Sequence, residues 1–270
     1  MLKVVGGCFV AAILQGTGVS AADVVISQVY TAGGNLNAVY QNDFVELHNR
    51  GNTPVSLSGW TLQYATTNTW AATFLGGTLQ PGQYYLVEEG SGGATGQTLP
   101  PANASSSINF NTTSGKVALV SNGITLSGNC PSGPPIVDLV GYGVVVNCSE
   151  GTAAPAPAAN TALVRDGNGC VDTDNNAADF TLAAPNPRNT FSAVSVCVNP
   201  APVFVFAQRS VGGAFTANFT ADAAKSNQVQ FSSDLVAWTN LAITVSNAGA
   251  FFTFTDTNAA PRRYYRVVAQ

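Results

Sequence analysis

Charged residues are scarce in this chain. Asp, Glu, Lys and Arg make up 9% of its 270 residues, histidine occurs once, at His48, and the formal net charge is −4. Apart from Arg262, Arg263 and Arg266, which we interpret as solvated positions of a terminal strand, lysines and arginines are scattered, whereas a phosphate backbone requires a basic face. We therefore exclude nucleic acid as a partner. A single histidine also excludes most catalytic triads and zinc sites.

Signatures of catalysis are missing too. The chain has no Gly-x-Ser-x-Gly elbow, no phosphate-binding Gly-x-x-x-x-Gly-Lys-Ser/Thr loop and no His-Glu-x-x-His. Glu88 and Glu89 cannot act as a glycosidase pair, because adjacent residues of a strand point to opposite faces, and we interpret them as a solvated strand end. His48, near Asp43 and Glu46, is interpreted as an exposed strand histidine. We predict that the protein is not an enzyme.

Hydrophobic runs long enough to span a bilayer are absent. Lys3 precedes an apolar stretch over residues 4–14, and Val19-Ser20-Ala21-Ala22 has the small side chains of a processing site, so we predict a signal peptide over residues 1–22. The apolar stretch is far shorter than the roughly 20 residues of a membrane-spanning helix. We therefore predict an exported protein, extracellular or at the cell surface, without a transmembrane segment in the mature chain.

Four cysteines remain after the predicted signal peptide, and an even number in an exported protein predicts two disulfides. They are Cys130, Cys148, Cys170 and Cys197. Sequential pairing, Cys130 with Cys148 and Cys170 with Cys197, is favoured because each bridge then closes a Gly/Pro/Asn-rich segment. A metal site is not favoured by the spacing, since no Cys-x-x-Cys pair occurs.

Helix-forming residues are few, whereas Gly, Ser, Thr, Asn, Val and Phe are common, which is typical of strands joined by turns. Short runs with period-two alternation predict the strands of a β-sandwich. These runs are 24–30, 43–49, 60–65, 84–88, 116–121, 136–142 and 161–165. After a Pro-rich linker over residues 194–202 a second set follows, at 203–206, 213–219, 228–232, 238–241, 251–254 and 263–268. The predicted class is all-β, with domains at 23–193 and 203–270.

Five motifs follow one another in the first domain. They are Asp43–Asn49, then Gly51 to Leu62 with Gly59 and Trp60, then Leu79–Val87, then Val137–Gly143, and last Asp172–Phe180 with Pro185 and Pro187. Together, from about Val24 to Thr190, they resemble the lamin-tail domain family. The resemblance implies an immunoglobulin-like β-sandwich that is not itself catalytic and that also occurs in exported bacterial proteins. The cysteines, the predicted signal peptide and the lack of a coiled-coil rod depart from the animal members, so nuclear filament roles are not implied.

The second domain resembles a C-terminal module of secreted planctomycete and verrucomicrobial proteins. The residues that carry this resemblance are Phe231, Asp234-Leu235, Trp238-Thr239, Phe254, Asp256 and Arg263–Val267. The module implies a small, fibronectin-III-like β-sandwich of about 70 residues.

An acidic segment is the candidate ligand site. Asp172, Asp174 and Asp179, with Asn175 and Asn176 between them, alternate the oxygen ligands that Ca²⁺ accepts. The segment lacks the glycine and the terminal glutamate of an EF-hand loop, and Asp and Asn side chains commonly cap turns through their own backbone. Both interpretations stay open, and no other cofactor is predicted.

These observations predict a non-catalytic protein of the cell surface or extracellular matrix. Its partner would be a surface protein or a second copy of the chain, bound through sheet edges, in adhesion or assembly. The alternative is a polysaccharide-binding module, in which Tyr64, Trp70 and Tyr85 would stack on sugars if they are exposed, although core packing explains most aromatic residues of a sandwich. A secreted hydrolase or nuclease is the third class, and no predicted site supports it.

Overall fold

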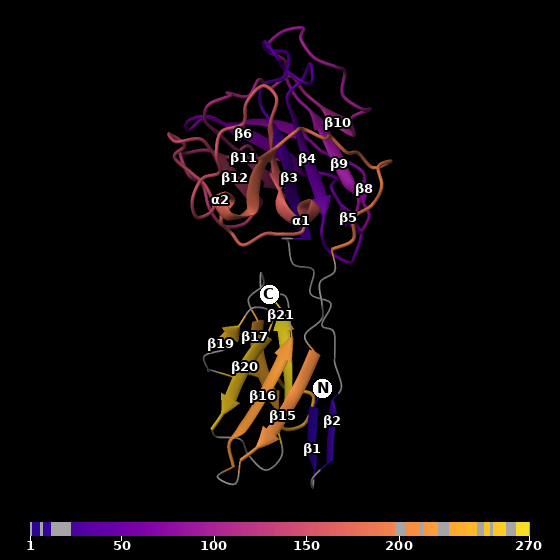
Figure 1. The fold of residues 1–270 in the computed structure, drawn as a ribbon, viewed down its shortest axis with the longest axis vertical. Helices are drawn as coiled ribbons and strands as arrows, with labels where there is room; N and C mark the ends of the chain where they lie inside the picture. The colour runs from indigo at the N-terminus through magenta and orange to yellow at the C-terminus, as the bar shows by residue number, and fades with distance from the viewer. Residues whose placement is uncertain are drawn as a thin grey trace. The chain divides into compact units, whose positions relative to one another are not determined.

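The computed structural model describes residues 2–5, 8–11, 23–197, 203–210, 213–220, 227–241, 246–248, 251–257 and 263–269. The chain divides into two compact units, a larger one over Ala21–Cys197 and a smaller one made of Val198–Gln270 with Met1–Ser20 (Figure 1). The predicted all-β class is confirmed, because the described helices are two single turns, α1 (Asp166–Gly169) and α2 (Asn176–Asp179).

The larger unit is built from two main sheets. A six-stranded sheet has the order β10-β9-β4-β3-β13-β14, a four-stranded sheet the order β12-β11-β6-β7, and β5 pairs with β8. The strands are β3 (Val24–Tyr30), β4 (Phe44–Asn49), β5 (Val55–Ser56), β6 (Thr61–Ala65), β7 (Ala71–Phe74), β8 (Thr78–Leu79), β9 (Tyr84–Glu88), β10 (Ala104–Ser105), β11 (Gly115–Val120), β12 (Ile136–Tyr142), β13 (Ala162–Arg165) and β14 (Phe180–Ala183).

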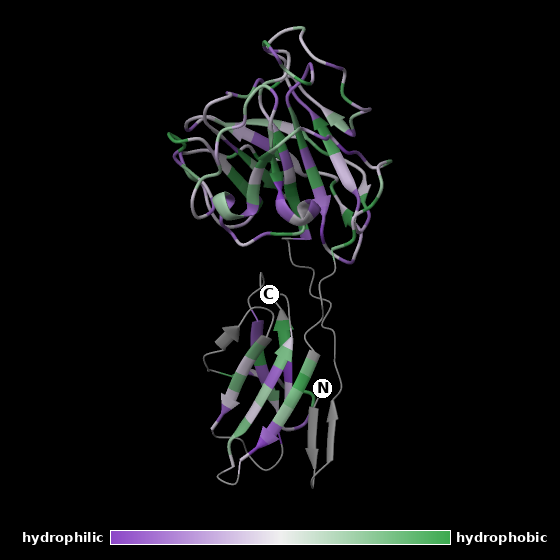
Figure 2. Cartoon of the chain, viewed as in Figure 1, coloured by the Kyte–Doolittle hydropathy of each residue, from purple (hydrophilic) through white to green (hydrophobic). Residues whose placement is uncertain are grey.

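The core of the larger unit lies between these two sheets. Val45 and Leu47 of β4 pack there against Leu62 of β6 and Leu119 of β11. In the register of β4 with β9, Val45 lies opposite Val87 and Leu47 opposite Tyr85, so one face of each strand enters the core. Hydrophobic and hydrophilic residues are interleaved along these strands (Figure 2).

Seven predicted strands of the larger unit match observed ones to within a residue at each end. Three of them, 24–30, 84–88 and 136–142, have the predicted bounds. The strands that were not predicted are short: β5, β8 and β10 have two residues each, and β7 and β14 have four. An alternation pattern cannot be recognised over so few residues, which explains these omissions.

The second face of the six-stranded sheet is covered as well. All six residues of β4 are buried, including Glu46 and His48, which alternate with the core residues. This face is contacted by the segment of residues 186–197, which we call the covering segment, through Asn186, Arg188 and Ser195. The charged and polar side chains of β4 on this face are therefore enclosed rather than solvated.

The smaller unit contains a five-stranded sheet and a four-stranded sheet. One has the order β18-β17-β21-β1-β2 and the other β15-β16-β20-β19. Their strands are β1 (Leu2–Val5), β2 (Cys8–Ala11), β15 (Val203–Arg209), β16 (Phe215–Thr220), β17 (Asn227–Ser232), β18 (Thr239–Asn240), β19 (Ser246–Ala248), β20 (Phe251–Asp256) and β21 (Tyr264–Ala269). Aromatic rings build its core: Phe215 stacks on Tyr265 at 4.4 Å between ring centroids, and Phe254 contacts both.

Parts of three predictions fall outside the described residues. Of the predicted signal peptide, residues 2–5 and 8–11 are described and form the hairpin β1-β2, whose first strand pairs with Tyr264 and Tyr265. Of the predicted linker, residues 198–202 lie outside the described range, as does Arg262. Both the signal peptide and the linker stay predictions. Among the described helices, none has the length and hydropathy needed to cross a membrane.

Candidate functional site

A fully buried arginine organises one end of the larger unit. Arg165, the last residue of β13, donates from Nε to the Ile26 carbonyl oxygen at 2.8 Å. Its Nη2 donates to both carboxylate oxygens of Asp138, at 3.1 and 2.9 Å. Its Nη1 lies 3.0 Å from Asp172 Oδ1 and 3.5 Å from Asp179 Oδ2. A planar guanidinium is suited to this task because its fixed fork binds several carboxylates at once.

The predicted calcium ligands lie in and beside this group. Asp172 Oδ1 binds Arg165, and its Oδ2 lies 3.0 Å from Arg50 Nη1. Asp179 accepts hydrogen bonds from the backbone N–H and the hydroxyl of Thr173. Asp174 is exposed, with a positive φ of 54°. Two of the three carboxylates thus bind guanidinium and turn donors, and calcium binding by these residues stays a prediction.

Glu150 completes what we call the arginine cluster, which consists of Arg50, Asp138, Glu150, Arg165, Asp172 and Asp179. Carboxylate oxygens of Asp138, Glu150 and Asp172 lie within 4.8 Å of one another. Glu150 accepts hydrogen bonds from the Leu139 N–H at 3.1 Å and from Asn176 Nδ2 at 3.2 Å. Burial and the nearby aspartates raise the pKa of Glu150 to about 9. Burial also raises the pKa of Asp138, so the cluster favours binding of a proton at neutral pH.

Glu150 should make the stability of the larger unit dependent on pH. Its pKa rises from an ordinary 4.5 to about 9 on folding, so the stabilisation is complete below pH ~4.5 and is lost as the pH rises through 9. Because the side chain is partly exposed, we expect the free energy of unfolding to fall by about 2 kcal/mol between pH 5 and 9. Urea denaturation at a series of pH values measures this fall. In the Glu150→Gln variant, the part of the slope of unfolding free energy against pH that comes from Glu150 should vanish.

A matched control for this prediction is Glu88→Gln, at a strand end outside the cluster. It should keep the slope of the unsubstituted chain. A Glu150→Gln protein whose stability falls with pH as steeply as that of the unsubstituted chain would show that Glu150 is ionised in the folded state.

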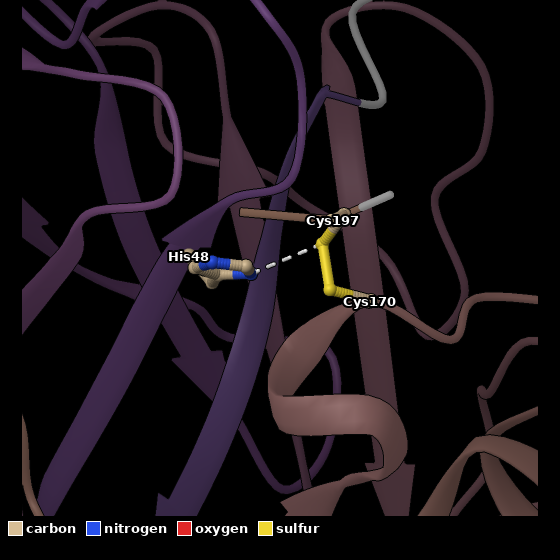
Figure 3. A group of neighbouring side chains, drawn as sticks. All are labelled: His48, Cys170 and Cys197. Atoms are coloured by element: carbon tan, nitrogen blue, oxygen red, sulfur yellow. Dashed lines mark hydrogen bonds between the residues drawn. A yellow bond between two sulfur atoms is a disulfide. The ribbon is translucent and has the colours of Figure 1, made fainter. Parts of the chain in front are cut away.

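His48 lies in a second buried group, beside a disulfide (Figure 3). Its ring stacks on Tyr84 at 4.5 Å between centroids, and its Nε2 lies 2.9 Å from the Ser195 carbonyl oxygen. Its Nδ1 lies 4.0 Å from Cys197 Sγ. Burial lowers the pKa of His48, which favours the neutral ring. Nδ1 also lies 3.3 Å from the Gly169 carbonyl oxygen, so each ring nitrogen has a backbone acceptor within reach, and the nitrogen that carries the proton donates to its carbonyl.

The disulfides pair as predicted, Cys130 with Cys148 and Cys170 with Cys197. Donor atoms of His48, Cys170 and Cys197 lie within 4.8 Å of one another, which is close enough for a metal ion. In this structure the two sulfur atoms are bonded to each other, so they close the covering segment onto α1 rather than ligate an ion.

The covering segment is also held by an ion pair. Arg188 binds Glu46 through Nε at 3.0 Å and Nη2 at 2.8 Å, and its backbone N–H donates to the same carboxylate. The guanidinium carbon lies 3.6 Å from the centroid of the Tyr84 ring. The prediction that His48 is exposed is therefore wrong, because a segment distant in sequence covers the strand face on which Glu46 and His48 lie.

Other sequence predictions are corrected by the same kind of burial. Glu89 is not solvated: it is buried and accepts hydrogen bonds from the hydroxyls of Thr73 and Ser106. Arg263 and Arg266 are not merely solvated, since Arg263 pairs with Asp256 at 2.5 Å and Arg266 donates to Gln230. The three aromatic residues named for sugar stacking, Tyr64, Trp70 and Tyr85, are buried, as core packing predicts.

Sequence reasoning missed the residues that organise both buried groups, namely Arg165, Asp138, Glu150 and Arg188. One signal was available. Asp138 interrupts the apolar strand Ile136–Tyr142, and Arg165 follows the apolar run Ala162–Val164. A charge that continues a buried strand needs a partner of opposite sign, because unpaired burial of an ion is costly. An ion pair between Asp138 and Arg165 could therefore have been predicted from the two strand sequences.

The comparison with protein families concerns the larger unit. Residues 18–143 match the family model described as Lamin Tail Domain. The matched range ends just after β12, so β13, β14 and the covering segment lie beyond it. No curated protein matches the chain at a significant level. Lamin tail domains are immunoglobulin-like, generally non-catalytic, and involved in binding or assembly. The larger unit is therefore similar to lamin tail domains over residues 18–143, and the all-β chain has a further β domain beside it.

Proposed function

We propose that the chain is an exported, non-catalytic protein of the cell surface or extracellular matrix that acts by protein binding or self-assembly. Its similarity to lamin tail domains supports a binding or assembly role. Its two disulfides support a place outside the cytoplasm, because such bonds persist in oxidising compartments. The predicted signal peptide agrees with this location.

The observation that carries the proposal is the edge strand β15. It has seven residues and pairs with β16, and among the described strands no second neighbour pairs with it. A register shift between Phe204 and Phe206 makes Val205 an extra residue, as in a β-bulge. Val205 and Phe206 are consequently both exposed, by 54% and 50%. An exposed edge with apolar side chains can pair with a strand of another chain.

Self-association of the purified, oxidised chain should depend on β15. We expect light scattering after size-exclusion chromatography to detect dimers or larger species as the concentration is raised. Val205→Lys and Phe206→Lys should raise the dissociation constant at least about tenfold, because a buried lysine at a paired edge is costly.

The matched control is Val236→Lys, in a turn of the same unit where the side chain is 84% exposed. It should associate like the unsubstituted chain. A chain that is monomeric at every concentration would refute self-assembly and direct the search to heterologous protein partners. Association that is unchanged in both edge variants would refute the role of β15.

A further inference from the structure

A surface groove of about 770 Å³ opens beside the covering segment. Three parts of the larger unit meet there: the end of β7 with the turn that follows it, the β8-β9 hairpin with β10, and residues 190–191 of the covering segment. The side chains that the argument uses are Phe74, Thr78, Gln80, Ser105 and Phe191. Tyr85, which the sequence analysis named for sugar stacking, also lines the groove, but its side chain is buried.

The groove carries no charge. Its lining contains phenylalanine, tyrosine, leucine, glycine, alanine and the uncharged polar residues Thr, Ser, Asn and Gln, but no Asp, Glu, Lys, Arg or His. A charged ligand would leave water here without gaining a counterion, which costs free energy. The lining thus favours an uncharged ligand that offers both apolar surface and hydroxyl groups.

Two phenylalanine rings supply the apolar surface. Phe74, at the end of β7, is 68% exposed, and Phe191, in the covering segment, is 89% exposed. Large apolar side chains so exposed within one groove are typical of a binding surface. An aromatic face can stack on the C–H face of a pyranose ring, which buries apolar area without demanding hydrogen bonds there.

The wall that carries Phe191 is held in place by the fold. Asn103 Nδ2 donates to the Thr190 hydroxyl at 2.7 Å, and Gln83 Nε2 donates to the Thr190 carbonyl at 3.2 Å. The disulfide at Cys197 closes the same segment a few residues later. Because these polar groups bind one another, the groove is preorganised before any ligand arrives, which lowers the entropic cost of binding.

Hydroxyl and amide groups remain available at the rim. The residues Thr78, Gln80 and Ser105 are exposed and line the groove. Hydroxyls and carboxamides can each donate and accept, as sugar hydroxyls do. An extended peptide is a weaker fit, because β-strand addition needs a long free edge, and the neighbouring strands β7 and β10 have four and two residues.

We propose that this groove binds a neutral polysaccharide, with Phe74 and Phe191 stacking on pyranose rings and Thr78, Gln80 and Ser105 bonding to their hydroxyls. The proposal goes beyond the assembly role of β15 and does not depend on it, since the groove lies in the larger unit and the edge strand in the smaller one.

Affinity electrophoresis of the full chain through gels containing soluble neutral polysaccharides (β-glucan, xylan, galactomannan) tests the proposal. We expect at least one of them to retard the chain, and polygalacturonate, which is charged, to have no effect. Phe74→Ala with Phe191→Ala should raise the apparent dissociation constant about tenfold. Because both rings are exposed, the double variant should keep the melting temperature of the unsubstituted chain.

The matched control is Leu36→Ala with Val144→Ala, two apolar side chains that are 83% and 101% exposed outside the groove. It should be retarded like the unsubstituted chain. The proposal would be overturned if no neutral polysaccharide retarded the chain, or if the Phe74/Phe191 variant were retarded as strongly as the unsubstituted chain. It would also be overturned if an unfolded polypeptide competed for the groove and the polysaccharide did not.

Discussion

Replacing Arg165 with methionine is expected to lower the free energy of unfolding of the larger unit by about 3–5 kcal/mol. The substitution leaves the carboxylates of Asp138, Asp172 and Asp179 without their shared guanidinium. It also removes the hydrogen bond that Arg165 Nε donates to the Ile26 carbonyl oxygen. Removing one partner of a buried ion pair costs more than the pair contributes, because the remaining charge stays buried without compensation.

Urea denaturation followed by tryptophan fluorescence measures this effect. A Trp238→Phe background restricts the signal to Trp60 and Trp70, which lie in the larger unit. Arg165→Lys tests the geometry: it keeps the charge but loses the fork that binds Asp138 through two oxygens, and we expect an intermediate loss.

A double-mutant cycle separates the pair from general disruption. Asp138→Asn in the Arg165→Met background should cost less than Asp138→Asn alone, because the aspartate then has no guanidinium to lose. An Arg165→Met chain within about 1 kcal/mol of the unsubstituted one would contradict the assigned role of the cluster.

Removing the Cys170–Cys197 disulfide, as Cys170→Ala with Cys197→Ala, should cost about 3–4 kcal/mol. The bridge closes a loop with a sequence separation of 27 residues, and the chain-entropy model assigns that order of stabilisation to such a loop. A second consequence is local. Without the bridge the covering segment is held chiefly by Arg188 and by the hydrogen bonds of residues 186–195, so hydrogen exchange of its amides should become faster.

The other disulfide provides the matched control. Cys130→Ala with Cys148→Ala opens a loop with a separation of 18 residues and should cost a similar free energy. It should leave exchange in the covering segment unchanged, because this bridge joins the chain before and after β12 and has no cysteine in that segment. Equal exchange of residues 188–197 in both variants would show that the Cys170–Cys197 bridge does not hold the segment.

Several features could be predicted from the sequence because they depend on local patterns. Alternation over five to seven residues predicted β3, β9 and β12 with their bounds. The positions of four cysteines relative to turn-rich segments predicted the disulfide pairing. Ordered motifs over the first domain predicted its lamin-tail similarity, which the family match confirms up to residue 143.

The two buried groups could not be predicted in the same way. Arg165 binds Asp138, which is 27 residues away in the sequence, and Ile26, which is 139 residues away. Glu46 and Arg188 bind each other at a sequence separation of 142 residues. Alternation along β4 contains no information on whether another segment covers the face on which Glu46 and His48 lie. The exposed histidine of the sequence interpretation thus became a buried one.

The sequence by itself determined the all-β class, the main strands of both units and the disulfide pairing. Tertiary structure decided which polar residues are buried, which carboxyl groups have a raised pKa, and where two exposed phenylalanines share an uncharged groove. The physical reason is that strand formation and turn chemistry depend on neighbours in the chain, whereas burial and pKa depend on segments that only folding brings together.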